Sequence, residues 1–262
     1  MKRHVLVAIG IALVVTLSAV SCQKKTESES SAPSTAPRAA PAPSATPEAA
    51  PATGGGLSGV VSFKGTVPPA KTIQLEADPQ CVTMHPGGLK ASDIEVGTGN
   101  GLKDTLVYVS SDVSGTFTPP SASVTIDQQG CWYHPRMVAM MAGQTLVVRN
   151  SDNTVHNFHT QSKVNPVINQ VQSTVGDISK VLSKPEKPFD VKCDIHPWMK
   201  GTLAVFSHPY FAVTDDNGAY TIPNLPPGDY TITAYHPKAG TVSQKVTVDS
   251  SGKATLNLTI AK

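Results

Sequence analysis

Short runs of alternating hydrophobic and polar residues recur along the chain after residue 56, and clusters of Gly, Pro, Asp, Asn and Ser separate them. A period of two is typical of β-strands with one buried face, and such clusters are typical of turns. The runs predict strands over residues 58–63, 105–109, 123–126, 144–149, 220–222, 230–234, 245–248 and 255–260. Helical periodicity is weak, and the best helical candidate is a short turn within residues 167–175. The pattern therefore predicts an all-β protein.

The N-terminus has the pattern of an export signal. Two basic residues precede an apolar stretch over residues 5–20, which is too short to span a bilayer comfortably. Small residues precede Cys22, as they do at the cleavage site of a lipoprotein signal peptide. Residues 1–22 are thus predicted to be a signal peptide with Cys22 as the lipid anchor; an uncleaved anchor and an ordinary secretory signal are the alternatives. We expect an exported, membrane-anchored protein of the periplasm or cell surface, and Gln23 favours an outer membrane over an inner one.

Residues 23–56 are rich in Pro, Ala, Ser and Thr and contain almost no bulky apolar side chains. Such a segment cannot bury enough apolar surface to fold. Proline at this density favours extended conformations. The segment is therefore predicted to be a disordered tether between the membrane anchor and the folded part of the chain.

Charge and motifs exclude several classes of function. Removal of residues 1–21 takes away two basic side chains and leaves 19 basic and 19 acidic ones, so nothing indicates nucleic-acid binding. The sequence contains no C-x-x-C-H haem motif, no phosphate-binding loop and no recognisable catalytic triad or carboxylate pair. We therefore do not expect an enzyme.

The cysteine count is informative for an exported protein. If Cys22 is acylated, three cysteines remain in an oxidising compartment, where a free thiol is unusual. The odd number fits one disulfide between Cys81 and Cys131 and one thiol, Cys193, that a metal protects. The alternative is a second metal site of the Cys2His2 type, formed by Cys81, Cys131, His85 and His134.

Three kinds of metal ligand occur within seven residues: the thiolate of Cys193, the imidazole of His196 and the thioether of Met199. Soft sulfur combined with nitrogen favours copper, or zinc if the site is tetrahedral and the methionine does not bind. A trigonal copper site needs a second histidine, and His156 supplies it shortly after a predicted strand. His159 would point to the opposite side of an extended strand, so we expect it to be structural.

The spacing C-x2-H-x2-M and the upstream H-N-x-x-H resemble the ligand motifs of cupredoxins, particularly those of the amicyanin type. Residues 142–150 (AGQTLVVRN) are similar to a strand motif of this family, so the resemblance covers roughly residues 121–206. Two departures are Val191, where the family usually has an aromatic residue, and the longer stretch over residues 160–190. The resemblance implies one type 1 (blue) copper ion, with His156, Cys193 and His196 as equatorial ligands and Met199 as the weak axial ligand.

The same resemblance implies a function in single-electron transfer. In cupredoxins the histidine of the ligand loop commonly reaches the surface through an apolar patch. We therefore expect His196, Pro197 and Trp198 to form the face at which a redox partner protein docks transiently.

The C-terminal part resembles a second family. Residues 213–234 resemble carboxypeptidase-regulatory-like sandwiches, which are transthyretin-like (prealbumin-like) and also similar to the small β-domain of rhamnogalacturonan lyases. Residues 59–65 (GVVSFKG) match the opening strand of that family. We therefore expect residues 57–120 and 207–262 to form one split β-sandwich of a carbohydrate-binding-like fold, with residues 121–206 inserted as a cupredoxin Greek-key domain.

Two other functions are compatible with the sequence. The split sandwich could make the protein an envelope binding module for carbohydrate or protein, although fold does not imply function and its strands show no row of exposed aromatics. The copper site could instead serve copper storage or delivery, which requires the metal to leave readily.

Overall fold

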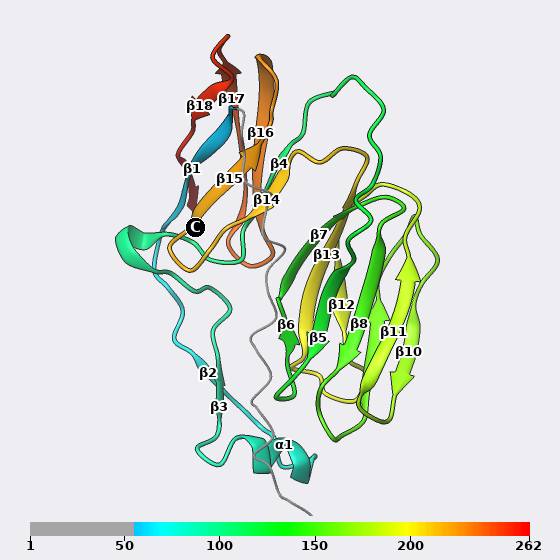
Figure 1. The fold of residues 1–262 in the computed structure, drawn as a ribbon. Coiled ribbons are helices and arrows are strands. Elements are labelled where there is room, and N and C mark those ends of the chain that lie inside the picture. The colour runs from blue at the N-terminus through cyan, green and yellow to red at the C-terminus, as the bar shows by residue number, and fades with distance from the viewer. Residues whose placement is uncertain (1–54) are drawn as a thin grey trace, which may run out of the picture. The chain divides into compact units, whose positions relative to one another are not determined.

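The computed structural model describes residues 55–262 (Figure 1). The predicted signal peptide, the lipid attachment site Cys22 and nearly all of the predicted tether lie outside these residues. Within them the regular elements are strands, apart from the six-residue helix α1 (Pro79–Met84) and the 3-10 helix η1 (Thr98–Asn100). No helix in this range is long and apolar enough to cross a membrane. The all-β prediction is confirmed.

The two ends of the described chain build one sandwich, which we call the outer sandwich. In its first sheet β1 pairs antiparallel with β15 and parallel with β18 and β19, so the first strand is held between C-terminal ones. The strands of this sheet are β1 (Gly56–Lys64), β15 (Ala219–Pro223), β18 (Lys253–Thr255) and β19 (Leu258–Ala261). The second sheet has the order β14 (Phe211–Val213), β4 (Leu106–Val109), β16 (Gly228–His236) and β17 (Gly240–Val248). The core between the two sheets of the outer sandwich includes Leu57, Val61, Val107, Ile222 and Ile232, as the alternation of apolar residues predicts.

The inserted domain is a second sandwich. One sheet has the order β10 (Asn169–Gln172), β9 (His156–Thr160), β12 (Glu186–Lys192), β13 (Lys200–Phe206) and β7 (Met137–Met141). The other has the order β11 (Gly176–Val181), β8 (Thr145–Asn150), β5 (Val124–Gln128) and β6 (Tyr133–His134). Ile126, Leu146, Val148, Phe158 and Leu203 fill the space between the sheets. The two-sandwich architecture predicted from the sequence is thus observed.

The predicted helical turn within residues 167–175 is wrong. Residues 169–172 form β10, an edge strand that pairs antiparallel with β9. Val171 pairs with Asn157 of β9, so backbone hydrogen bonds to the neighbouring strand stabilise an extended conformation here. The local sequence does not reveal this partner.

A small apolar cluster joins the two sandwiches where β13 leads into β14. Leu106, Met137, Ala204 and Phe206 are its buried members. The Phe206 ring lies 5.1 Å from the ring of Tyr108 in the outer sandwich. The chain therefore passes between the sandwiches through a packed junction.

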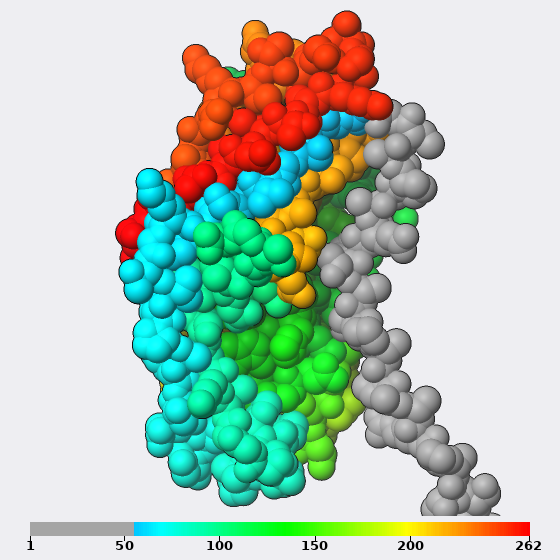
Figure 2. Space-filling view, turned by 90° about the vertical axis from the view of Figure 1, so that its left-hand side faces the viewer, coloured from blue at the N-terminus to red at the C-terminus, as the bar shows by residue number. Residues whose placement is uncertain are grey.

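Residues 71–91 leave the outer sandwich after β1 and pack on the inserted domain; we call this segment the strap. It contains β2 (Lys71–Ile73), α1 and β3 (Leu89–Ala91). Leu75 and Cys81 of the strap belong to the core of the inserted domain, and Cys81 forms a disulfide with Cys131. In space-filling view the cyan and blue-green residues of this part of the chain lie against green residues of the inserted domain (Figure 2). The strap thus belongs to the outer sandwich by sequence and to the inserted domain by packing.

Candidate metal centre

The ligand residues come from two neighbouring strands of the inserted domain. His156 is the first residue of β9, and Cys193 follows β12 directly. The chain then turns back into β13, and this turn is closed because the Cys193 N–H donates to the Met199 carbonyl (3.1 Å) and the Met199 N–H donates to the His196 carbonyl (2.9 Å). The pairing of β12 with β9 and β13 therefore brings all four predicted ligand residues to one end of the sandwich.

Three donor atoms converge there. The Nδ1 atoms of His156 and His196 lie 3.0 Å apart, and the Cys193 Sγ lies 3.8 Å from the His196 Nδ1. One ligand atom from each of the three residues lies within 4.8 Å of the others, and all three residues are buried. Met199 is fully buried in the core cluster that also contains Cys193. The structure thus brings together the three equatorial ligands predicted from the sequence, with Met199 beside Cys193 in the core.

The Cys193 sulfur lies in surroundings that favour the thiolate. Burial alone would raise the pKa of the thiol, but hydrogen bonds from His156 and His196 lower it. The backbone N–H groups of Asn157 and His196 also donate to Sγ, at 3.3 and 3.4 Å. The net result is a pKa lowered to about 6, so Cys193 is a thiolate at neutral pH and suited to bind a metal.

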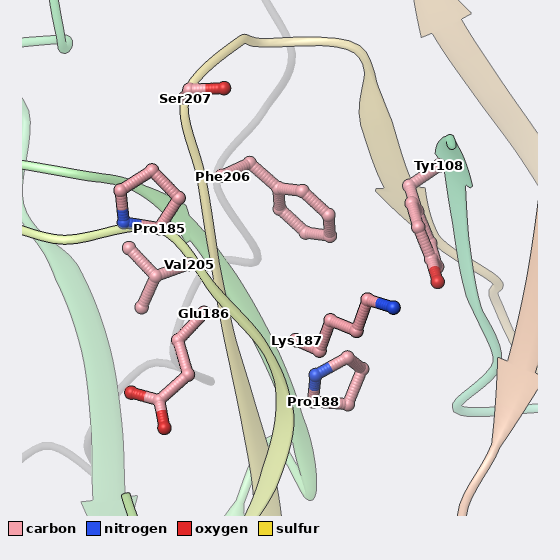
Figure 3. A pocket seen from close by; sticks show the side chains of 8 residues that line it. All are labelled: Tyr108, Pro185, Glu186, Lys187, Pro188, Val205, Phe206 and Ser207. Carbon is pink, nitrogen blue, oxygen red and sulfur yellow. The ribbon is translucent and has the colours of Figure 1, made fainter. Parts of the chain in front are cut away.

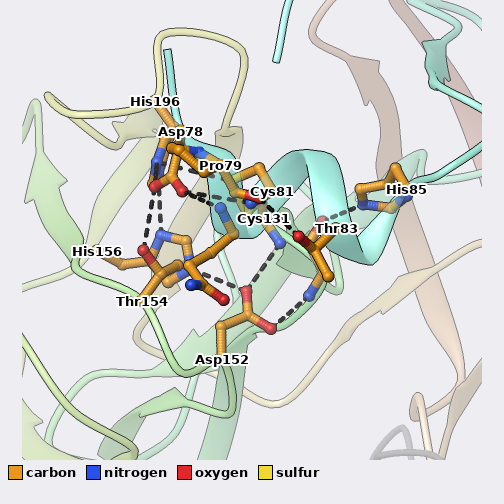
Figure 4. Close-up of a disulfide and its surroundings, with 12 residues drawn as sticks. Asp78, Pro79, Cys81, Thr83, His85, Cys131, Asp152, Thr154, His156 and His196 are labelled. Carbon is orange, nitrogen blue, oxygen red and sulfur yellow. Dashed lines mark hydrogen bonds and ion pairs between the residues drawn. A yellow bond between two sulfur atoms is a disulfide. The ribbon is translucent and has the colours of Figure 1, made fainter. Parts of the chain in front are cut away.

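Both imidazoles donate to carboxylates on their outer edges (Figure 4). The His156 Nε2–H donates to Asp152 Oδ2 at 2.8 Å, and the His196 Nε2–H donates to Asp78 Oδ2 at 2.9 Å. Burial raises the pKa of both carboxyl groups, but hydrogen bonds from the histidines and from backbone N–H groups outweigh it, so both pKa values are lowered. Because ionised carboxylates can only accept, both Nε2 atoms carry protons, and both Nδ1 atoms face the centre.

The centre suits a cation. With both Nε2 atoms protonated, an Nδ1–H that donates to the other ring or to the Cys193 thiolate needs a second proton on that imidazole, and a bound cation can take the place of this proton. Burial opposes the charged form of His156, but hydrogen bonds to Asp152 and Cys193 raise its pKa overall. Two nitrogens and a soft sulfur, with a thioether nearby in the core, are a donor set that fits copper.

The expectation that His196 reaches the surface is wrong. Its side chain is only 2% exposed, because the strap lies over its outer edge. Asp78 accepts from its Nε2, and the Cys81 Sγ lies 3.7 Å from the same atom. Pro197 is exposed and Trp198 is partly buried, with its ring 5.1 Å from the His196 ring. The part of the predicted docking face that reaches solvent thus consists of Pro197 and Trp198.

The other candidate ligands have structural partners. The Cys81–Cys131 disulfide is observed, so these sulfurs do not form the alternative Cys2His2 site. His85 Nε2 hydrogen-bonds to the Gly130 carbonyl at 2.7 Å, and His159 Nδ1 to Asp194 Oδ2 at 2.7 Å. The structural role predicted for His159 agrees with this contact.

Sequence reasoning missed the two carboxylates of the centre. Asp152 has a weak signal, since it lies four residues before the predicted ligand His156. Asp78 has none, because it belongs to a segment without any metal-binding motif and lies 118 residues from His196.

A pocket away from the centre lies where β12 passes close to β4 (Figure 3). Tyr108, Pro185, Pro188 and Phe206 supply most of its apolar lining. The Glu186 carboxylate accepts from Ser162 and from the backbone N–H groups of residues 163–165. Besides apolar groups, the pocket therefore offers the exposed side chains of Lys187 and Ser207.

Similarities to known proteins concern separate parts of the chain. Residues 202–261 match the carboxypeptidase regulatory-like domain. That match confirms the resemblance seen in the sequence for the C-terminal part of the outer sandwich. No curated protein matches the chain significantly.

Solved structures similar to the chain include copper proteins. A purple cupredoxin from Nitrosopumilus maritimus is 21% identical and aligns over 32% of this chain and 100% of its own, with a TM-score of 0.28. An amicyanin variant with Cu(I) is 18% identical over 32% of this chain and 82% of its own (TM-score 0.30). The copper-containing nitrite reductase of Thermus scotoductus is 19% identical over 37% of this chain and 25% of its own (TM-score 0.31).

Proposed function

We propose that the inserted domain binds one copper ion in a type 1 site and acts as a single-electron carrier. His156, Cys193 and His196 would be the equatorial ligands and Met199 the axial one. The observation that carries this proposal is the convergence of the Nδ1 atoms of two imidazoles and the Cys193 sulfur on one buried point. When bound, copper supplies a one-electron couple between Cu(II) and Cu(I).

The surrounding residues suit this role because they leave the ligands little freedom to move. The backbone bonds between Cys193 and Met199 fix the loop, and the two carboxylates fix the imidazoles. Exposure of the three equatorial ligand residues is 2% or less, so water is excluded from the centre. A buried, rigid ligand set favours electron transfer over catalysis, because it leaves no open position for a substrate.

In this proposal Trp198 would carry the electron between the centre and the surface. Its ring lies against that of His196, and its Nε1–H donates to the Cys131 carbonyl at 3.1 Å, which fixes the ring orientation. With the exposed Pro197 it would form a small face for transient contact with a redox partner protein.

The proposal includes export and attachment to a membrane through a lipid on Cys22. The Cys81–Cys131 disulfide supports export, because such bonds persist in oxidising compartments. Mass spectrometry of the mature protein from membranes tests the anchor: a diacylglyceryl group on an N-terminal Cys22 is expected.

Cu(II) loading of the purified protein tests the metal site. We expect an intense thiolate-to-copper band in the visible spectrum and the narrow copper hyperfine splitting of a type 1 site. Cys193→Ser and His156→Ala should abolish both signals. His159→Ala is the matched control, because His159 lies on the same strand outside the site and should leave the spectrum unchanged. A wild-type protein without the band, or a band that survives in Cys193→Ser, would overturn the proposal.

Copper delivery is less compatible with the structure than electron transfer. The strap and the disulfide cover the outer edge of His196, so a chelator cannot reach the ligand without displacing them. Transfer of Cu(I) to a competing chelator should accordingly be slow.

A further inference from the structure

Two carboxylates, Asp152 and Asp78, each accept a hydrogen bond from one imidazole of the proposed site. Asp152 is 4% exposed and lies in the loop before β9. The Asp78 side chain is 17% exposed and comes from the strap, so it reaches the site from outside the inserted domain. Each accepts one Nε2–H and thereby turns the Nδ1 of that ring toward the other ligands.

The disulfide connects the two carboxylates. The Cys81 N–H donates to Asp78 Oδ1 at 3.3 Å, and the Cys131 N–H donates to Asp152 Oδ2 at 2.8 Å. Each half of the disulfide therefore orients one of the two carboxylates through its backbone (Figure 4). A chain of contacts thus runs from His156 through Asp152, the disulfide and Asp78 to His196.

Two further contacts tie this arrangement to neighbouring loops. The Thr154 hydroxyl donates to Asp78 Oδ2 at 3.0 Å, which joins the strap to the loop that carries Asp152. Asp78 is also the N-cap of α1, where its Oδ1 accepts from the Gln80 N–H at 2.8 Å. Asp78 therefore has little freedom to rotate away from His196.

We propose that Asp78 and Asp152 are positioning residues for the metal and that the Cys81–Cys131 disulfide is the brace that holds them. The proposal rests on the proposed copper site and adds a role for a segment outside the inserted domain. The carboxylates fix the tautomer and orientation of both ligand imidazoles and increase their basicity, as partners of metal-bound histidines do elsewhere. Their negative charges also favour Cu(II) over Cu(I).

Substitutions at Asp78 separate the effects of charge and hydrogen bonding. Asp78→Asn removes the charge and keeps an acceptor, whereas Asp78→Ala removes both. We expect Cu(II) affinity to fall by about 10–100-fold in both variants, the usual effect of losing such a partner. If Cu(I) affinity changes less, the reduction potential rises by about 59 mV for each tenfold selective loss of Cu(II) affinity. Asp93→Asn is the control, because Asp93 lies near the strap in an exposed ion pair with Lys71.

A measurement on metal-free protein adds a readout that does not depend on copper. Nitrogen NMR of the wild-type protein should show His196 protonated at Nε2. Asp78→Ala should show a mixture of tautomers, and Asp152→Ala should do the same for His156. The double variant Cys81→Ser/Cys131→Ser should weaken the preference at both histidines. Melting curves of each variant identify any that do not fold, and Asp78→Asn retains the acceptor that caps α1.

The outcomes separate this proposal from the proposed function. A wild-type protein without a type 1 spectrum would overturn the copper site itself. A wild-type protein with that spectrum, whose potential, Cu(II) affinity and tautomers are unchanged in both Asp78 variants relative to Asp93→Asn, would overturn the positioning role and leave the copper site standing.

Discussion

The Nδ1 atoms of His156 and His196 lie 3.0 Å apart although the Nε2–H of each ring donates to a carboxylate. Two imidazoles in this arrangement repel each other unless a proton or a metal ion lies between them. Metal-free protein is therefore expected to be less stable than metal-bound protein.

Copper should raise the melting temperature of the chain. At a free metal concentration about 1,000 times Kd, the gain is about 4 kcal/mol, or roughly 10 °C for a protein of this size. Calorimetry with and without copper measures it. His156→Ala should lose most of the gain and His159→Ala should keep it. Equal shifts in the two variants would contradict the assigned ligand set.

Removal of the Cys81–Cys131 disulfide should destabilise the metal-free protein by about 2–4 kcal/mol, because the bond closes a loop between residues 50 apart. Urea denaturation of Cys81→Ser/Cys131→Ser measures the loss. An unchanged midpoint would show that the strap is held by packing alone.

Glu186 predicts a pH effect remote from the metal centre. Burial opposes its ionisation, but hydrogen bonds from Asn165, Ser162 and the Lys163 N–H lower its pKa to about 2. Because the folded pKa lies below the unfolded one, the unfolded chain binds a proton first as the pH falls. This stabilisation is complete above pH 4.5 and is lost as the pH falls toward 2.

Glu186→Gln should therefore reduce the free energy of unfolding by about 2–3 kcal/mol at pH 7, and the difference from wild type should shrink below pH 4.5. Denaturation of both proteins across this pH range tests the sign. A difference that grows on acidification would contradict it.

Trp198→Ala should leave the copper spectrum intact and slow electron exchange several-fold, since its partly exposed ring contacts the ring of His196. Stopped-flow oxidation of the reduced protein measures the rate. Trp132→Ala is a useful comparison, because Trp132 is partly buried and contacts Arg136. Equal rates in both variants would assign the route to other residues.

The convergence of His156, Cys193 and His196 could be predicted from the sequence because they lie in two short segments whose spacing is typical of a metal site. His156 begins a strand, and Cys193 and His196 share one loop, so local pattern and strand pairing suffice. Asp78 could not be predicted, because its contact with His196 depends on how the strap packs over the inserted domain. The buried position of His196 was missed for the same reason.

Strand prediction failed where long-range pairing determines local structure. Residues 255–260 alternate as one strand, yet the structure divides them between β18 and β19. At the break the Val60 N–H donates to the side-chain Oδ1 of Asn257 at 2.9 Å instead of to a backbone carbonyl, while β18 and β19 keep one register along β1. The alternation of residues 255–260 does not indicate this interruption.

The strap makes the candidate metal centre of the inserted domain depend on residues that belong to the outer sandwich by sequence. A fragment limited to residues 121–206 would retain every predicted copper ligand, but it would lack Asp78 and leave Cys131 without its disulfide partner. Its His196 edge would face solvent, as the cupredoxin resemblance alone implies. The closed outer edge of this centre thus depends on strap residues, which belong to the outer sandwich by sequence. A transfer of the inserted domain into another scaffold would have to include these residues to keep that edge closed.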